Sequence, residues 1–268
     1  MKRFIVPLSA VSAAVLILIA CSTVPITGRK QLNIIPAGTM QSMSYQEYGT
    51  FLKNNKLSSN AQQVDMVRRV GNGIRGAVER YFAEKGLSGE LKGYQWEFNL
   101  IESPEVNAWC MPGGKVVVYT GILPITQSEN GLAVVMGHEI AHAIAEHGNE
   151  RMSQGLMTQL GGMALNEALA NKPAETRALY MTAFGLGAQV GVLLPFSRTH
   201  ESEADRLGLI FMAMAGYDPN EAVAFWQRMA AKKGGGSPPE FLSTHPSDQT
   251  RIADIQKHMP EALRYYKK

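Results

Sequence analysis

The sequence has too few cysteines for a disulfide framework and too little positive charge for a nucleic-acid interface. Two cysteines occur among the 268 residues, which excludes a small scaffold held together by disulfides. Charged residues make up 18% of the chain and the formal net charge is +3, so no nucleic-acid partner is expected. Hydrophobic residues make up 45%, an ordinary globular composition that excludes a fibrous or disordered chain, and no internal repeat is visible.

A hydrophobic run at the beginning of the sequence has the pattern of a signal peptide. A basic pair precedes the apolar stretch, so residues 1–20 are predicted to be a lipoprotein signal peptide. The stretch ends in the letters LIAC, which resemble a bacterial lipobox, and Cys21 is expected to carry the lipid that holds the protein on a membrane. Ser22 stands where an aspartate would favour the inner membrane. The prediction is a lipid-anchored protein on the periplasmic face of the bacterial envelope, in the outer membrane.

The remaining sequence predicts a tether followed by one α+β domain that is mostly helical with a small β-sheet. Residues 21–59 are rich in serine, threonine, proline, glycine and asparagine, and they are expected to form a lipidated tether and docking segment. Residues 60–268 are expected to form the folded domain. Hydrophobic periodicity predicts helices over about 61–85, 128–147, 200–215, 219–231 and 249–258, and strands over about 94–100 and 115–120.

An apolar segment rich in glycine, alanine, methionine and leucine covers residues 152–194. No charged residue occurs over residues 178–197, a stretch nearly long enough to span a bilayer. Glycines and a proline interrupt this stretch, so a membrane span is not expected. The segment is predicted to be a buried helix, or an apolar flap over a cleft, with its methionine and leucine side chains in the core.

His138, Glu139 and His142 form the pattern H-E-x-x-H within the predicted helix over residues 128–147. Residues four apart share a helical face, where their Cβ atoms lie about 5–6 Å apart, so two imidazoles can bind one zinc ion. Glu139 lies one step round the helix and is expected to be the general base that takes a proton from the attacking water. The pattern favours a zinc peptidase over a helix with two unrelated histidines.

A catalytic zinc needs a third protein ligand, and the nearest histidine does not fit. His147 lies nine residues after His138, and about 100° per residue turns it to the opposite face of a continuous helix. The ligand is therefore expected from a distant part of the sequence. A second histidine, His200, is a rival because imidazole also suits zinc.

Acidic residues four apart in the stretch over residues 197–205 supply the better candidates. Glu201 and Asp205 share one helical face, which fits one carboxylate on the metal and the other hydrogen-bonded to a ligating imidazole. Glu203 and Arg198 lie in the same stretch. Glu203 points away from Asp205, and a solvated helix face accounts for these two charges as well as a functional role does.

Four stretches together resemble peptidase family M48, in its periplasmic lipoprotein and Oma-type members. They are residues 107–114 (NAWCMPGG), 138–142 (HEIAH), 197–205 (SRTHESEAD) and 243–246 (STHP). Their order and spacing make the resemblance specific over about residues 60–258. The resemblance implies a gluzincin-like metallopeptidase domain over residues 60–268, with a small β-sheet beside the active-site helix.

The resemblance also implies how the site is built. One zinc ion per chain is held by the two histidines of the H-E-x-x-H pattern and by Glu201, and Asp205 supports a zinc histidine. Asn107 and Ala108 lie at an edge strand, where an extended or unfolded polypeptide binds through its backbone. Cys110, beside apolar neighbours, is interpreted as core packing and not as a nucleophile.

His245 and Arg251 lie near the zinc in members of this family. Two roles for His245 stay open at this point. Its imidazole either stabilises the negative charge of the transition state or occupies the open position of the metal and holds the enzyme inactive. On spacing alone, His245 could equally cap the last helix. Arg251 is expected to support turnover under either role.

The sequence therefore predicts a zinc-dependent metalloendopeptidase of the bacterial cell envelope that cleaves misfolded or stalled envelope proteins. Its expected partners are unfolded polypeptides, the membrane through the lipid on Cys21, and envelope assembly machinery. The alternative is a chaperone or assembly factor for outer-membrane proteins in which zinc is structural. The complete H-E-x-x-H pattern argues against this alternative, because a structural zinc site has no use for Glu139.

Overall fold

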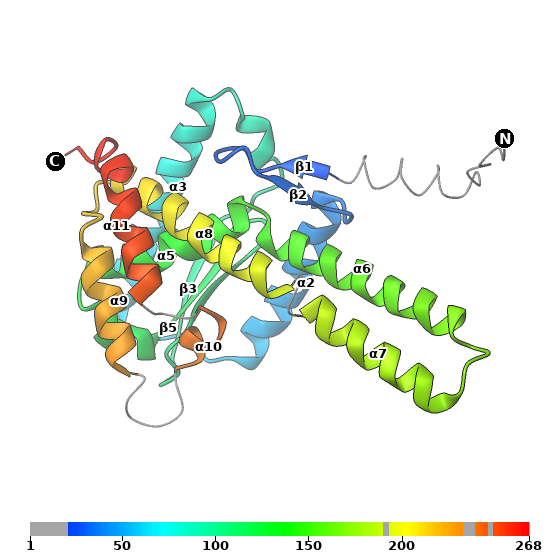
Figure 1. Cartoon of the computed structure of the whole chain (residues 1–268). Helices are drawn as coiled ribbons and strands as arrows, with labels where there is room; N and C mark the ends of the chain where they lie inside the picture. Colours follow the sequence, from blue (N-terminus) through cyan, green and yellow to red (C-terminus); the bar gives the residue numbers. More distant parts are fainter. Residues whose placement is uncertain (1–20, 190–192, 233–238, 246–248, 268) are drawn as a thin grey trace. The chain divides into compact units, whose positions relative to one another are not determined.

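The computed structural model describes residues 21–189, 193–232, 239–245 and 249–267, and most of these residues are helical. The predicted signal peptide over residues 1–20 lies outside this range. The predicted fold class, a mostly helical α+β chain, is confirmed by the helices and the small sheet of Figure 1.

Two compact units divide the chain. The first comprises Met1–Ala37 and Gly148–Pro195, and the second comprises Gly38–His147 and Phe196–Lys268. The predicted division at residue 59 into a tether and a peptidase domain stays a prediction. Within the described residues, the segment expected to be a tether contains a helix, α2 (Ala37–Asn54), and this helix belongs almost entirely to the second unit.

The second unit holds a three-stranded sheet and most of the helices. Its strands are β3 (Glu97–Ile101), β4 (Ala108–Met111) and β5 (Lys115–Tyr119). Its helices besides α2 are α3 (Ala61–Glu84), α4 (Leu123–Thr126), α5 (Glu129–Ile144), α8 (Leu194–Met214), α9 (Glu221–Ala231), α10 (Glu240–Thr244) and α11 (Gln249–Leu263), with the 3-10 turns η1 (Ser88–Leu91) and η2 (Thr120–Ile122).

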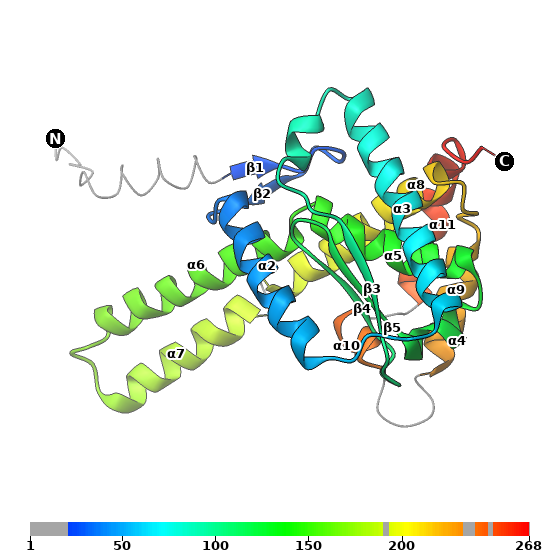
Figure 2. The same cartoon turned by 180° about the vertical axis from the view of Figure 1, so that it is seen from behind.

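The sheet has the order β3-β5-β4, and Figure 2 shows its three strands between α2 and α3. The central strand β5 pairs in parallel with β3 and antiparallel with β4, and every one of its residues is buried, as expected of a valine-rich run covered on both faces. Gly113 and Gly114 turn the chain between β4 and β5 with φ of +88° and +89°, a region that favours glycine. The strand predicted over residues 115–120 is confirmed, and β4 lies at an edge of the sheet.

Helix α5 is the buried centre of this unit. Its predicted start is confirmed, because the Ser128 Oγ accepts a hydrogen bond from the Gly131 N–H at 3.1 Å. Almost every residue of α5 is buried, and the helix packs against α3, β4 and α9. The helix ends at Ile144 and not at residue 147, because the chain turns through Glu146, whose φ is +56°.

A close crossing brings α8 against α5. A Cβ atom added to Gly208 of α8 would lie 2.8 Å from the backbone nitrogen of His138 and 2.9 Å from the carbonyl carbon of Gly137. A Cβ atom essentially never lies this close to a non-bonded backbone atom, so glycine is what allows the two backbones to approach. The crossing places the acidic residues of α8 beside the histidines of α5.

The first unit contains a small two-stranded sheet and a helical hairpin. Its elements are β1 (Cys21–Thr23), β2 (Lys30–Leu32), α6 (His147–Ala168, apart from its first residue) and α7 (Ala174–Ala188). The antiparallel β1–β2 pair is joined to the start of α6, because Arg29 forms an ion pair with the buried Glu150 at 2.8 Å and the Ile34 N–H donates to the Ser153 Oγ at 2.9 Å.

The hairpin of α6 and α7 exposes many of its apolar side chains. Both views show the two helices side by side, and the ring of Phe184 packs near Gly161. The exposed apolar side chains are Met152, Leu156, Met157, Leu160 and Met163 on α6 and Leu179, Tyr180 and Leu186 on α7. The prediction that the methionines and leucines of this segment lie in a core is therefore wrong for these residues. None of the helices in the described part of the chain combines the length and hydropathy that a bilayer crossing requires.

Candidate metal centre

Two histidines from one face of α5 form the base of the site. His138 and His142 lie one helical turn apart, as the H-E-x-x-H spacing predicts, and their Nε2 atoms are 3.0 Å apart. Both side chains are buried. The two imidazoles therefore direct their outer nitrogens at one small volume inside the protein.

Glu201 on α8 faces the same volume. Its Oε2 lies 3.3 Å from the His138 Nε2, and its Oε1 lies 3.3 Å from the His142 Nε2. The Oε1 atoms of Glu201 and of the neighbouring Glu139 are buried and make no well-aligned hydrogen bond among the described residues, although an imidazole nitrogen lies near each of them. Buried carboxylate oxygens without a partner are costly unless a cation or water is bound there.

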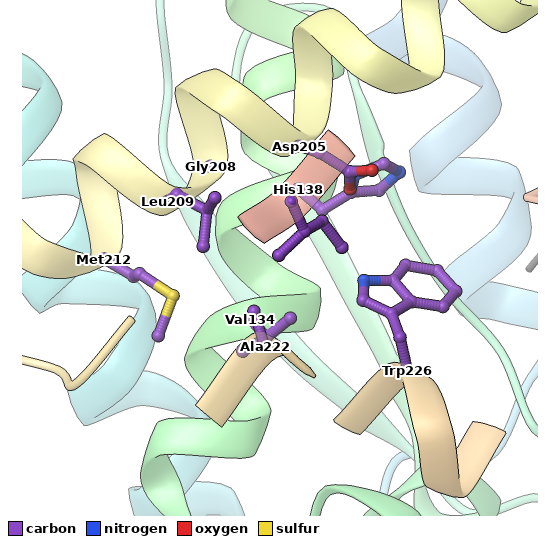
Figure 3. Close-up of a pocket in the computed structure, with 9 residues that line it drawn as sticks. Val134, His138, Asp205, Gly208, Leu209, Met212, Ala222 and Trp226 are labelled. Carbon is purple, nitrogen blue, oxygen red and sulfur yellow. The ribbon is translucent and has the colours of Figure 1, made fainter. Parts of the chain in front are cut away.

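Asp205 lies behind His138, as the spacing of four on α8 predicts. Its Oδ1 is 2.9 Å from the His138 Nδ1, so the imidazole donates this proton to the carboxylate and turns its Nε2 toward Glu201. Arg251 of α11 donates to Asp205 at 2.7 Å and to Glu201 at 3.0 Å. Its guanidinium lies 3.5 Å from the ring centroid of Trp226, which Figure 3 shows beside His138 and Asp205.

His245, which follows α10, closes the group. Its Nδ1 is 2.9 Å from the Glu201 Oε2 and 3.2 Å from the His138 Nε2, and its Nε2 is 3.5 Å from the Glu139 Oε1. The ring of Phe241 packs on the imidazole, with 4.7 Å between the ring centroids. His245 thus stands between Glu201 and the candidate base Glu139.

Burial and hydrogen bonding set the charges of these groups. Burial by itself lowers the pKa of His138, but its hydrogen bonds to two carboxylates raise that pKa to about 9. Burial holds the pKa of His142 well below its usual value, which keeps this imidazole neutral. Burial opposes ionisation of Glu201, but hydrogen bonds from the surrounding histidines hold its pKa far below the usual range. Burial raises the pKa of Glu139.

The donor set fits a zinc-like cation. His138, His142, Glu201 and His245 each offer one ligand atom, and these atoms lie within 4.8 Å of one another. Two imidazole nitrogens with one carboxylate oxygen are the ligands of many catalytic zinc sites. Ligand nitrogens must be deprotonated to bind a metal, so a cation at this site would compete with protons for the imidazoles.

The structure places His147 and Glu203 differently from the sequence-based expectation. His147 does not join the ligand group, but its Nδ1 lies 2.8 Å from the His142 Nδ1, and its Nε2 lies 2.9 Å from the Glu203 Oε2. Of the two alternatives left open for this pair, a solvated helix face does not fit Glu203, which is buried, whereas Arg198 is exposed. The rival ligand His200 stacks on His147 at 4.3 Å and stays outside the group.

The predicted substrate residues lie at the edge of the sheet. Ala108 begins β4, and its N–H donates to the Asn107 Oδ1 at 2.9 Å. Burial raises the pKa of the Cys110 thiol on the same strand, which disfavours the nucleophilic thiolate. The predicted acylation of Cys21 stays a prediction.

Comparison with known proteins gives a family for this arrangement. The pattern of the family described as Peptidase family M48 matches residues 72–259, which include the histidines, the acidic residues and the arginine of the site. The predicted resemblance to this family is therefore confirmed.

Individual relatives agree with the family match. Mitochondrial metalloendopeptidase OMA1 of Schizosaccharomyces pombe is 36% identical over 89% of this chain and 66% of its own length. Metalloendopeptidase OMA1, mitochondrial, of Bos taurus is 34% identical over 90% of this chain and 46% of its own length. Beta-barrel assembly-enhancing protease of Escherichia coli is 32% identical over 60% of this chain and 34% of its own length. The chain spans less than two thirds of each of these relatives.

These relatives correct one prediction. The expected location on the periplasmic face of the bacterial outer membrane is contradicted, because the relatives that match about nine tenths of the chain are mitochondrial proteins. The lipobox resemblance that led to this prediction lies in residues 18–21, almost entirely outside the described residues.

Proposed function

The chain belongs to peptidase family M48, and on this basis we propose that it is a zinc-dependent endopeptidase that cleaves extended or unfolded polypeptide. The observation that carries the proposal is the convergence of His138, His142 and Glu201 on one buried volume with Glu139 beside it. A purely structural zinc site needs no general base, whereas peptide hydrolysis does. The printed names of the relatives, metalloendopeptidase and protease, support the same activity.

Each residue of the site has a distinct part in this reaction. Bound zinc would polarise the scissile carbonyl and lower the pKa of water. Glu139 takes a proton from the attacking water and passes it to the leaving amine, a task for which its raised pKa is suited. Arg251 donates to the carboxylates of Glu201 and Asp205 and lies 3.3 Å from the His138 Nδ1, so we propose that it positions these groups, whereas the sequence predicts a catalytic role.

The edge strand β4 gives the proposed substrate a place to bind. The Tyr119 N–H donates to the Asn107 carbonyl at 3.1 Å, so alternate residues of β4 bond to β5. The backbone groups of Ala108 and Cys110 therefore point to the other edge of the strand. An extended peptide can pair there as a further strand, with main-chain hydrogen bonds and little sequence preference.

Digestion of an unfolded protein tests the proposed activity. We expect purified protein to cut reduced, carboxymethylated casein into fragments when zinc is present, to stop when a chelator removes the metal, and to recover when zinc is restored. Mass spectrometry of the fragments should show internal cleavage. Digestion that continues unchanged in excess chelator, after dialysis, would contradict the metal-dependent mechanism.

The sequence leaves two roles open for His245, stabilisation of the transition state and occupation of the open position of the metal. Its position in the structure favours the second, gating role. A catalytic zinc keeps one position open for water, and the base must contact that water. The His245 imidazole lies between Glu139 and Glu201, in the space that a zinc-bound water would need. We propose that this conformation is the inactive one.

His245→Ala should therefore increase turnover of unfolded casein. If the open form is about a tenth of the wild-type population, the gain is on the order of tenfold. The control is His258→Ala, a partly buried histidine of α11 outside the ligand group, which should leave turnover unchanged. Loss of activity in His245→Ala with zinc still bound would instead assign the imidazole to transition-state stabilisation.

A second candidate function is chaperone-like binding of unfolded protein with a structural zinc. The exposed methionine and leucine side chains of α6 and α7 favour it, because contiguous apolar surface is typical of sites that bind proteins or membranes. The two functions differ in their need for Glu139. The second function would be supported if Glu139→Gln suppressed aggregation of an unfolded protein and the wild type did not cleave that protein.

A further inference from the structure

We propose that His147 and Glu203 form a relay behind His142 that fixes the orientation and tautomer of its imidazole and thereby sets the affinity of the site for zinc. The proposal concerns two residues that lie outside the ligand group. It rests on the metal site of the proposed function, since the relay has a role only if His142 binds the cation.

The relay is a continuous line of short contacts. The His142 Nδ1 lies 2.8 Å from the His147 Nδ1, and the His147 Nε2 lies 2.9 Å from the Glu203 Oε2. All three side chains are buried, with 1% of His147 and 7% of Glu203 exposed. Hydrogen bonds to charged groups in such surroundings are stronger than those at the surface.

Only one arrangement of protons satisfies both contacts with neutral imidazoles. His142 must keep the lone pair of its Nε2 for a cation, so its Nδ1 carries the proton and donates it to the His147 Nδ1. His147 then carries its own proton on Nε2 and donates it to Glu203. The carboxylate of Glu203 thus selects the tautomer of His142 through one intervening ring.

The other histidine of the H-E-x-x-H pattern, His138, contacts its supporting carboxylate directly. The His138 Nδ1 donates directly to Asp205 at 2.9 Å, with no residue between them. Glu203 and Asp205 come from the same helix, α8, two residues apart, and therefore project from different faces of it. One helix thereby supplies a carboxylate for each of the two histidines of α5, directly for His138 and through His147 for His142.

The local backbone explains how His147 reaches His142. A continuous helix would carry His147 away from the histidine face, but α5 ends at Ile144 and the chain turns at Glu146 with a φ of +56°. His147 then begins α6. The ring of His200 stacks on the His147 ring with 4.3 Å between centroids and 15° between planes, which holds the ring plane in place.

Zinc affinity, measured by competition with a chromophoric chelator, tests the relay. Loss of an outer partner of a zinc histidine costs about 10–100-fold in metal affinity. We expect a loss in this range for His147→Phe, which keeps an aromatic ring against His200 but offers no nitrogen to His142. His147→Asn should recover part of the affinity, because its Oδ1 can accept the proton from the His142 Nδ1. His258→Phe, a matched change on α11, should keep the wild-type affinity.

Two further measurements separate a positioning role from a structural one. Glu203→Gln keeps an acceptor oxygen for the His147 Nε2 and loses the charge, so we expect a smaller loss of affinity than in His147→Phe. Thermal unfolding of each metal-free variant reports stability without zinc. Equal zinc affinities for wild type, His147→Phe and His147→Asn would overturn the relay, whatever the melting temperatures. A wild-type protein that binds zinc no better than His142→Ala would instead overturn the metal site itself.

Discussion

Glu139→Gln should fold, bind zinc with wild-type affinity and cleave unfolded casein at least about 100-fold more slowly than the wild type. Glutamine has the shape of glutamate but cannot take a proton from water. Glu139 is buried beside the ligand group, and burial raises its pKa, which makes the carboxylate a stronger base than an exposed glutamate. The measurement is kcat/KM on a fluorescent peptide or casein, with zinc content determined on the same sample.

A change at the other end of the same helix provides the control. Glu129→Gln removes a carboxylate from the first turn of α5, where it pairs with Arg69 at the surface and lies far along the helix from the histidines. Exposed ion pairs contribute little to stability, so this variant should keep both activity and zinc. Cleavage by Glu139→Gln within a few-fold of the wild type would rule out the proposed base.

Glu201→Ala should lose zinc more completely than the relay variants, and with it all hydrolysis. This residue offers one oxygen to each of the two histidines of α5 and is the one carboxylate in the ligand group. Its removal eliminates a direct ligand, so the affinity should fall by more than the about 10–100-fold expected for an outer partner. Inductively coupled plasma mass spectrometry after dialysis measures the bound metal.

The stability of this variant needs a separate check. Arg251 and His138 both contact the Glu201 carboxylate, and removing one partner of a buried charge pair costs about 3–5 kcal/mol. Glu201→Gln keeps the volume of the side chain and should also lose zinc, while circular dichroism shows whether the metal-free protein is folded. Glu240→Ala, an exposed acidic residue of α10, is the control. A folded Glu201→Gln protein with full zinc occupancy would contradict the ligand set.

Local patterns predicted the parts of the fold that local physics determines. The valine run of β5 and the glycine turn before it have the composition of a buried strand and a tight turn, and both are present. The start of α5 is also determined locally, because the Ser128 side chain accepts a hydrogen bond from the Gly131 N–H in the first turn. Helix α2 was missed because its serine and glycine content resembles a tether, although Met40, Ser44 and Tyr48 are buried at helical spacing and are the signal that could have found it.

The site was predictable where its residues share one helix and not where it depends on tertiary contacts. His138 and His142 follow from a spacing of four on α5. His147 was placed on the wrong side because the prediction assumed a helix that continues past Ile144, and a single residue with positive φ changes its direction. Trp226 lies far in sequence from Arg251, and no local pattern predicts that their side chains stack.

The exposed apolar side chains of α6 and α7 were mispredicted for a related reason. Composition shows that a segment is apolar, but it does not show whether another element covers it. The segment has the methionine and leucine content of a core helix. Leu179 is 69% exposed and Met163 is 62% exposed, so these side chains are available to a surface or partner outside the described residues.

The candidate ligands are contributed by segments that are far apart in the chain, and this has a consequence for folding. His138 and His245 are 107 positions apart, and Glu201 and His245 are 44 apart. The ligands of α5 and α8 meet only after these helices have docked, and His245 joins them only when the segment after α10 has docked as well. A cation held by these groups therefore binds the native state and not the unfolded chain. At a free concentration of one hundred times its dissociation constant, such a ligand adds about 2.7 kcal/mol to the free energy of unfolding. The supply of metal would then determine the stability and lifetime of the folded protein as well as its catalytic activity.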